Sequence, residues 1–203
     1  NPAFETTDGV FTDGRLPRNN DGWIVKLTKE GTRLWAALLG GSGGDNALKV
    51  ATDKDGDIYV TGQQASFNFH RTPGVFQETF TGAPVVYCTK IRGNGTQIVY
   101  STGMRTTGPV APSSIWVDQK GNAYMLGTVG YTIVFPGFPT IPGSIVTTPD
   151  ALDGAYNAGD RVFPPPLGEP QSTVEGYISV LNPNATNQVY SSYIGENGDD
   201  FVL

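Results

Sequence analysis

The stretch DKDGDIYVTG, residues 53–62, returns as DQKGNAYMLG at residues 118–127. Each copy places a glycine-containing turn before a short run of aliphatic and aromatic residues. Runs of this kind, bounded by turn residues, are typical of antiparallel strands joined by tight hairpins. The chain shows no window of helical periodicity with end caps, so the repeat predicts an all-β protein.

Three further segments recur around this hairpin in a fixed order. They are GWIVKL at 22–27 with VYCTKI at 86–91 and GYISVL at 176–181; RLWAALLGG at 33–41 with QIVYSTGM at 97–104 and QVYSSYIG at 188–195; and TTDGVF at 6–11 with RTPGVF at 71–76 and TTPDAL at 147–152. Several features that recur in one order indicate stacked copies of one supersecondary unit.

One unit predicts four strands in roughly 65 residues, which is the content of a β-propeller blade. The strands are expected at 47–52, 57–63, 85–91 and 97–103 in one blade and at 113–118, 122–128, 176–181 and 187–194 in the next. Residues 22–39 are expected to supply the last two strands of an earlier blade. The predicted fold class is therefore all-β, a β-propeller with four-stranded antiparallel blades.

The predicted organisation is a fragment of one propeller over residues 1–203, with about three blades' worth of an incomplete ring. Its parts are expected as the end of one blade at 1–39, a full blade at 47–103, a full blade at 113–194 with a long insertion at 129–175, and the start of another blade at 199–203. Propellers close with about four to eight blades. We therefore expect a segment of a longer chain, with a self-associating arc as the alternative.

Six large aromatic residues occupy two repeated strand positions. They are Trp23, Tyr87 and Tyr177 at one position and Trp35, Tyr100 and Tyr190 at the other. Large rings at fixed strand positions fill the space between sheets that pack face to face. All six are expected to lie in the core.

The repeat also follows the pattern of a known family. The residues that carry it are Trp23, Lys26 and Leu27; Gly40, Gly41, Ser42, Gly43 and Asp45; Asp53, Gly56, Asp57, Tyr59, Val60, Thr61 and Gly62; Phe69, Thr72, Pro73, Gly74 and Phe76; and Tyr100, Ser101 and Thr102. In these positions the chain resembles the bacterial β-propeller repeat family abbreviated SBBP. The resemblance implies a large exported or surface-attached bacterial protein, usually without an assigned enzymatic activity. Val180 in place of the lysine and His70 in place of a proline depart from the pattern.

The amino-acid composition disfavours or excludes several classes of partner and of structural site. Nineteen acidic and thirteen basic residues give a net charge of −6, which disfavours a nucleic-acid partner. The single cysteine, Cys88, excludes an internal disulfide framework and a multi-cysteine zinc site. No apolar run approaches the length that a membrane-spanning helix needs.

The candidate ligand-binding residues lie mainly in a long loop. The predicted turns are short, whereas the loops at about 64–84 and 129–175 are long, and long loops on a rigid ring commonly carry recognition. The residues expected to contact a ligand are Tyr131, Phe135, Phe138 and Tyr156 in the second loop and Trp116 on the strand at 113–118. The alternative is a loop folded over the blade edge with its aromatic rings packed inward.

The sequence DKDGD places Asp53, Asp55 and Asp57 at alternate positions, as at the start of a calcium-binding loop. An EF-hand would need glutamate at the twelfth position, where Gln64 stands. A hairpin turn explains the same sequence, so no metal site and no cofactor is predicted.

No catalytic residue is predicted. His70, the single histidine, has no nucleophile-elbow pattern nearby, and Cys88 alternates with its neighbours on a strand as a small core residue would. Asp45 and Asp200 are expected to hold the connections between blades through hydrogen bonds to backbone amides.

We expect a non-catalytic extracellular or cell-surface module that presents its long loops to a protein or a polysaccharide. One alternative is a purely structural spacer in a large surface assembly. Another is a polysaccharide lyase or hydrolase with its site on the propeller axis, near Lys49 and Trp116.

Overall fold

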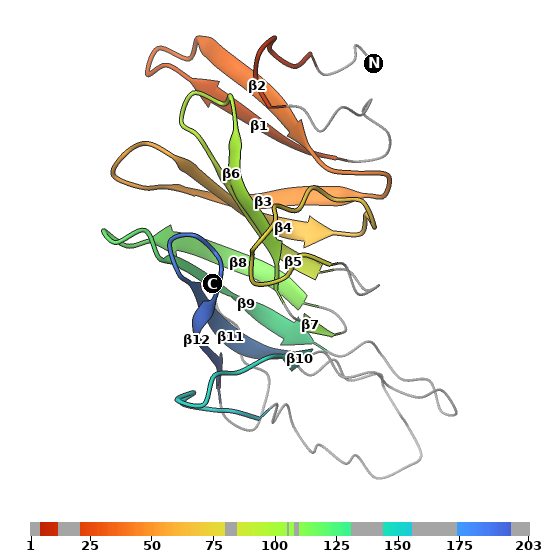
Figure 1. Ribbon diagram of the computed structural model, residues 1–203, viewed down its shortest axis with the longest axis vertical. Helices are drawn as coiled ribbons and strands as arrows, with labels where there is room; N and C mark the ends of the chain where they lie inside the picture. Colours follow the sequence, from red (N-terminus) through yellow and green to blue (C-terminus); the bar gives the residue numbers. More distant parts are fainter. Residues whose placement is uncertain are drawn as a thin grey trace, which may run out of the picture.

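The computed structural model describes residues 5–11, 21–79, 85–104, 106–107, 110–130, 144–155 and 174–195, which form strands and turns (Figure 1). The strands are β1 (Gly22–Leu27), β2 (Arg33–Leu39), β3 (Asp45–Thr52), β4 (Ile58–Gln64), β5 (Val85–Ile91), β6 (Ile98–Gly103), β7 (Thr106–Thr107), β8 (Val110–Val117), β9 (Ala123–Gly130), β10 (Ser144–Ile145), β11 (Val174–Leu181) and β12 (Gln188–Ile194). Within these ranges, no helix is long and apolar enough to cross a bilayer.

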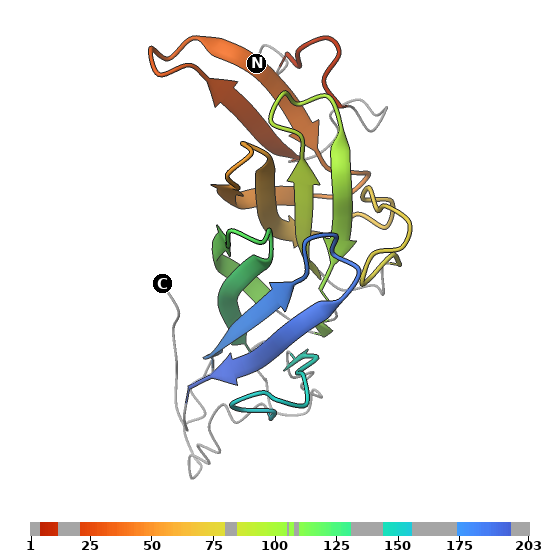
Figure 2. The same ribbon diagram turned by 60° about the vertical axis from the view of Figure 1, so that its left-hand side comes forward.

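Three antiparallel sheets stack face to face along the long axis of the molecule (Figures 1 and 2). The first sheet is the hairpin β1-β2, the second has the order β3-β4-β5-β6, and the third has the order β8-β9-β11-β12. The described strands form an open stack and do not close into a ring (Figure 1). The structure is therefore all-β and antiparallel, as the sequence predicts.

The predicted strands occur in the predicted order, and their observed ends differ from the predicted ones by at most three residues. The short pair β7 and β10 was not predicted, and β10 lies inside the long insertion. A pair of two residues is too short to leave a periodic pattern in the sequence. The division of the chain into blades, and their number, stays a prediction.

The five hairpin turns that join neighbouring strands share one hydrogen-bonding pattern. In each, the amide of the fourth residue donates to the carbonyl oxygen of the first. The fourth residues have positive φ: Gly31 (86°), Gly56 (80°), Gly95 (76°), Gly121 (89°) and Ala185 (53°). Glycine adopts this conformation without a steric penalty, which explains why the repeated turns of the sequence contain it.

A glycine in β4 fixes the register of the second sheet. Gly62 pairs with Ala47, and the register of β3 shifts between Ala47 and Lys49, which marks a β-bulge. A Cβ at Gly62 would overlap the carbonyl oxygen of Asn46. The absent side chain also leaves room for Tyr87 of β5, whose hydroxyl donates to that same oxygen at 3.0 Å.

The third sheet repeats this arrangement. Gly127 of β9 pairs with Pro112 beside a register shift in β8, and a Cβ at Gly127 would overlap the carbonyl oxygen of Ala111. The ring of Tyr177 from β11 lies over this glycine. The tyrosines at one repeated position are thus seated on glycines of the neighbouring strand.

Two hydrophobic cores separate the three sheets. The core between the first and second sheets contains Trp35, Ala37, Leu39, Ile58, Val60, Tyr87 and Ile91. The core between the second and third contains Tyr59, Cys88, Tyr100, Met104, Ile115, Val117, Met125 and Tyr177. Because neighbouring side chains on a strand point to opposite faces, the second sheet contributes to both cores.

The prediction that all six repeated aromatic residues lie in the core was wrong for Trp23. Trp35, Tyr87, Tyr100 and Tyr177 are buried, but Trp23 is 62 % exposed and Tyr190 is only half-buried. Trp23 lies on the first sheet and Tyr190 on the third. These two sheets end the stack, so no further described sheet covers their outer faces.

The third repeated motif forms a clamp segment on the outer strand of each sheet. In residues 6–11, the Thr7 amide donates to the carbonyl oxygen of Ala36 at 2.9 Å, and the Thr7 hydroxyl accepts from the Ala36 amide at 3.0 Å. Thr72 in residues 71–76 binds Ser101 in the same two ways, and Thr148 in residues 147–152 binds Ser191. Each clamp thereby satisfies backbone groups of an edge strand.

Two clamp segments also reach the next sheet. The Phe11 amide donates to the carbonyl oxygen of Gly95 at 2.7 Å, and the Phe76 amide donates to that of Ala185 at 2.7 Å. Gly95 and Ala185 occupy the same position in the β5-β6 and β11-β12 turns. The clamps therefore connect neighbouring sheets as well as protecting their edges.

The glycine beside the bulge gives a stability prediction. Gly62→Ala should destabilise the protein by more than about 3 kcal/mol, because a backbone carbonyl must move to admit the methyl group. Gly56→Ala, where the added Cβ meets no atom within 4 Å, should cost only about 1–2 kcal/mol from its positive φ. Urea unfolding of both variants measures the difference. Equal effects would contradict the close approach at Gly62.

Candidate functional site

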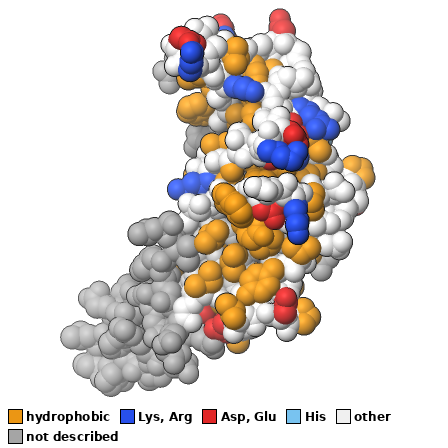
Figure 3. Space-filling model, turned by 90° about the vertical axis from the view of Figure 1, so that its left-hand side faces the viewer, with side chains coloured by type: hydrophobic (Ala, Val, Ile, Leu, Met, Phe, Trp, Pro, Cys, Tyr) orange, Lys and Arg blue, Asp and Glu red, His pale blue; other side chains and the backbone are white. Residues whose placement is uncertain are grey.

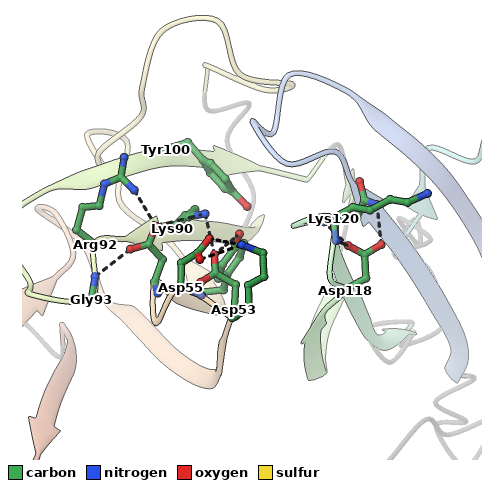
Figure 4. Close-up of polar contacts among 12 residues, drawn as sticks. Asp53, Asp55, Lys90, Arg92, Gly93, Tyr100, Asp118 and Lys120 are labelled. Atoms are coloured by element: carbon green, nitrogen blue, oxygen red, sulfur yellow. Dashed lines mark hydrogen bonds and ion pairs between the residues drawn. The ribbon is translucent and has the colours of Figure 1, made fainter.

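A cluster of ion pairs joins the β3-β4 turn to strand β5 (Figure 4). The Lys90 ammonium lies 2.9 Å from Asp53 and 3.4 Å from Asp57, and the Arg92 guanidinium lies 2.9 Å from Asp57. The side chains of Lys90, Asp53 and Asp57 are only 14 %, 7 % and 9 % exposed. We call these four residues the ion cluster.

Neutral groups complete the bonding of the two carboxylates. The Tyr59 hydroxyl donates to Asp53 at 3.2 Å, and the Lys90 ammonium lies 4.8 Å from the centre of the Tyr59 ring. The Gly93 amide donates to Asp57 at 3.1 Å. Both carboxylates of the ion cluster therefore have cationic and hydrogen-bonding partners within the protein.

Asp53 and Lys90 hold their charges at neutral pH. Burial raises the pKa of Asp53, but the hydrogen bond and charge of Lys90 and the amides of Asp55 and Asp57 outweigh it, so this pKa lies below its ordinary value. Burial lowers the pKa of Lys90, but hydrogen bonds to Tyr59 and Asp53 raise it above the ordinary value. The pair is thus ionised and mutually stabilised.

The three aspartates of the turn do not converge on a common point for a cation. Asp53 and Asp57 bind Lys90, whereas the exposed Asp55 pairs with Lys54 at 2.9 Å. In the part of the chain that the structure describes, no three acidic, histidine or cysteine side chains are grouped as metal ligands. The geometry here fits the hairpin-turn interpretation of this sequence.

Among the described residues, the third sheet holds the equivalent aspartate without a cation. Asp118 takes the place of Asp53, but Val180 replaces Lys90 and Asn122 replaces Asp57. The Asn122 side-chain amide donates to Asp118 at 2.7 Å, which supplies the donor that Lys90 supplies in the second sheet. The third sheet therefore lacks the lysine, and the asparagine that replaces one aspartate supplies the missing hydrogen-bond donor.

Asp45 holds the connection between the first and second sheets, as predicted. Its carboxylate accepts hydrogen bonds from the amides of Gly41 at 2.7 Å, Ala65 at 2.9 Å and Ser66 at 3.1 Å, and from the Ser66 hydroxyl. It is fully buried and ties two loops together. Asp200, the other residue predicted for this role, lies outside the described residues.

A partly buried polar contact between the first long loop and β4 was not predicted. Arg71 donates to the Gln64 side chain and lies 5.1 Å from the centre of the Phe69 ring. Burial lowers the pKa of Arg71 to about 10, while the charge of Asp45 opposes this shift. Arginine, glutamine and phenylalanine in a loop form no spacing pattern, so the sequence carried no signal for this contact.

Only one of the predicted ligand-binding residues can be placed. Trp116 lies on β8, is 57 % exposed, and its ring centre is 5.0 Å from that of Tyr124 on β9. The other four, Tyr131, Phe135, Phe138 and Tyr156, lie outside the described residues. The proposed loop site therefore lies almost wholly outside the described part of the chain and stays a prediction.

The residues considered for catalysis occupy different environments. Cys88 is fully buried, and burial raises the pKa of its thiol to about 12, which suits the predicted core role. His70 is half-buried in the first long loop, next to Arg71. Lys49 and Trp116 are exposed on β3 and β8, the first strands of their sheets.

The face that carries the hairpin turns has a mixed character. Hydrophobic side chains run along this face, with separate acidic and basic residues among them (Figure 3). A shallow hollow lies between the turns of the first and second sheets, lined by Lys26, Trp35, Asp55, Arg92 and others. Charges of both signs line this hollow, which disfavours a strongly ionic ligand there.

The ion cluster yields a prediction with an internal control. Lys90→Val should destabilise the protein by about 3 kcal/mol, because it leaves the buried carboxylate of Asp53 without a cation and removes one of the two cations beside Asp57. Adding Asp57→Asn should recover part of this loss, since an amide at that position can donate to Asp53 as Asn122 donates to Asp118. Urea unfolding of the two single variants and the double variant at pH 7 measures the coupling.

The ion cluster also predicts how the stability of the protein depends on pH. Since the pKa of Asp53 is below 3.8 in the folded state, its stabilising contribution is complete above about pH 4 and is lost as the pH falls through the folded value. Stability measured from pH 7 to pH 3 should therefore fall less for Lys90→Val than for the parent chain. The ion pairing would be contradicted if the effects of Lys90→Val and Asp57→Asn on the free energy of unfolding were additive. It would also be contradicted if the stability of Lys90→Val and of the parent chain changed in parallel with pH.

Comparison with known families agrees with this architecture. Residues 34–63 match the family model described as SBBP, a beta-propeller repeat. The matched residues include the Asp45 connection, β3, the turn of the ion cluster and nearly all of β4. No curated protein matches the chain. The chain thus carries a β-propeller repeat of the SBBP type.

Proposed function

We propose that the chain is a non-catalytic interaction module of an extracellular or cell-surface bacterial protein. The observation that carries this proposal is the use of its buried charged side chains. Lys90, Asp53 and Asp57 hold a turn to a strand, and Asp45 holds two loops together. Side chains committed to structural contacts suit a rigid support better than a reaction centre.

The ligand of this module is a protein or a polysaccharide bound by the insertion at 129–175. Its central described segment, residues 144–155, is anchored: the Ile145 amide donates to the Tyr193 hydroxyl at 3.0 Å, and the Asp153 amide donates to the Ser192 hydroxyl at 3.0 Å. A loop that is anchored in its middle can present its remaining residues at a lower entropic cost. The aromatic residues proposed to contact the ligand are Tyr131, Phe135, Phe138 and Tyr156.

A purely structural spacer is the second candidate, and the clamp segments favour it. Described residues of both long loops bind outer strands through Thr72 and Thr148, and Phe76 links two sheets. In this account the loops reinforce the stack and need no ligand.

A binding screen separates the two candidates. The chain is applied to arrays of bacterial and host polysaccharides and of surface proteins, alongside a variant with Tyr131→Ala, Phe135→Ala, Phe138→Ala and Tyr156→Ala. The interaction module predicts saturable binding that the four substitutions weaken at least about tenfold. Phe67→Ala, at a 77 % exposed position of the other long loop, is the matched control and should bind normally.

Each result of the screen has a defined meaning. Binding that survives the four substitutions would remove the insertion from the proposal. Absence of saturable binding across the arrays, with a folded chain, would favour the spacer.

A further inference from the structure

The β5-β6 and β11-β12 turns both carry an asparagine just before their residue of positive φ. Asn94 precedes Gly95, and Asn184 precedes Ala185. Both asparagines are exposed and occupy the same place in their turns. Because an alanine adopts the required conformation at position 185, with a φ of 53°, the backbone of this turn does not by itself demand a glycine.

Packing against the first sheet explains the glycine in the β5-β6 turn. A Cβ at Gly95 would lie 2.8 Å from a ring atom of Trp35. Carbon atoms in contact prefer a separation of about 3.5–4.0 Å, so a side chain at position 95 would displace the indole. Trp35 is buried in the core between the first and second sheets. This core therefore requires Gly95, and it leaves Asn94 next to a residue without a side chain.

The side chain of Asn94 is held by the end of its turn. Its Oδ1 atom accepts hydrogen bonds from the Thr96 amide at 3.1 Å and from the Thr96 hydroxyl at 2.8 Å. In the third sheet the Thr186 hydroxyl accepts from the Asn182 side chain at 2.8 Å, and among the described residues it forms no bond to Asn184. Two donors on Oδ1 draw electrons from the Cγ carbon and stabilise negative charge on the oxygen.

We propose that Asn94 is a site of spontaneous deamidation in the folded protein. The Gly95 backbone nitrogen, once it has lost its proton to a base, attacks Cγ of Asn94 and forms a new N–Cγ bond. The Cγ–Nδ2 bond then breaks, and Nδ2 takes a proton from water and leaves as ammonia. Water opens the resulting five-membered succinimide ring at either carbonyl, which leaves an aspartate or an isoaspartate at position 94.

Two features of the turn favour attack at Asn94 over attack at Asn184. Gly95 has no Cβ to hinder the approach of its nitrogen, and the Thr96 donors stabilise the oxyanion that forms on Oδ1. The Gly95 amide donates to the carbonyl oxygen of Arg92 at 2.8 Å, and the Ala185 amide forms the same bond at 2.9 Å. This bond opposes attack in both turns and does not distinguish them.

Isoaspartate at position 94 would weaken a contact between two sheets. It adds one carbon to the backbone of the turn, directly before Gly95. The carbonyl oxygen of Gly95 accepts the Phe11 amide at 2.7 Å, which is the bond that ties the first clamp segment to the second sheet. Deamidation therefore limits the lifetime of this link. The reaction needs no ligand, so it is independent of the proposed interaction role.

The test is to age the folded chain in mildly alkaline buffer and follow Asn94 in the tryptic peptide 93–105 by mass spectrometry. Asn94 should deamidate at least about tenfold faster than Asn184, the matched site with alanine in place of glycine. As isoaspartate accumulates, the Phe11 amide should exchange hydrogen faster. The Phe76 amide, which bonds to Ala185 in the other turn, is the control and should keep its rate.

Two variants separate the role of the folded turn from that of the Asn-Gly sequence. Thr96→Val removes the hydroxyl donor and should slow deamidation of Asn94 about threefold in the folded chain, but not in urea. Ala185→Gly should speed deamidation of Asn184 and still leave it slower than Asn94, because Thr186 does not hold its side chain.

Three results would overturn the proposal. The first is an Asn94 that stays intact in the folded chain while it deamidates in urea. The second is an equal rate at Asn94 and Asn184 in the parent chain. The third is a folded Thr96→Val variant that deamidates as fast as the parent.

Discussion

The hydrogen bonds of the clamp segments are the constraint on which the rest of the structure depends. A stack of separate sheets leaves an outer strand exposed in each, and exposed strand edges invite pairing with other chains. Thr7, Thr72 and Thr148 each form two bonds with an outer strand, and Phe11 and Phe76 reach the turn of the following sheet. Protection of the edges and connection of the sheets thus come from one short repeated motif.

The second and third sheets show two solutions to the same local problem. The second sheet uses Lys90 to satisfy Asp53, and the third uses Asn122 to satisfy Asp118. A buried ion pair must overcome the desolvation of both charges, so a hydrogen bond from an uncharged amide to the carboxylate can replace it at little cost in stability. The fold therefore requires a donor at this turn, but not a particular charge.

The sequence was sufficient to predict the strands of the three stacked sheets, their order and their hairpin turns, but not the short pair β7 and β10. Positive-φ glycines such as Gly56 and the alternation of residues in β5 are local features, and local features are visible in a repeat. The burial of Trp23 was predicted wrongly, because burial depends on whether a further sheet covers the site and not on the residue type. The contact of Arg71 with Gln64 depends on the path of a loop, which no local pattern specifies.

For the candidate site, the sequence pointed to the correct turn but not to its role. Asp53 and Asp57 stood out as possible cation ligands, while their partner Lys90 lies in a strand 33 or more positions later and was not singled out as a site residue. Pairing across strands determines the role of such residues.

The amide of Phe76 offers the most direct test of the central claim, that the clamp segments join the sheets into one body. Native-state hydrogen exchange of this amide reports the bond to the carbonyl oxygen of Ala185. The account predicts that it exchanges as slowly as the amides inside β6 and β12. Exchange as fast as that of an exposed loop would contradict it.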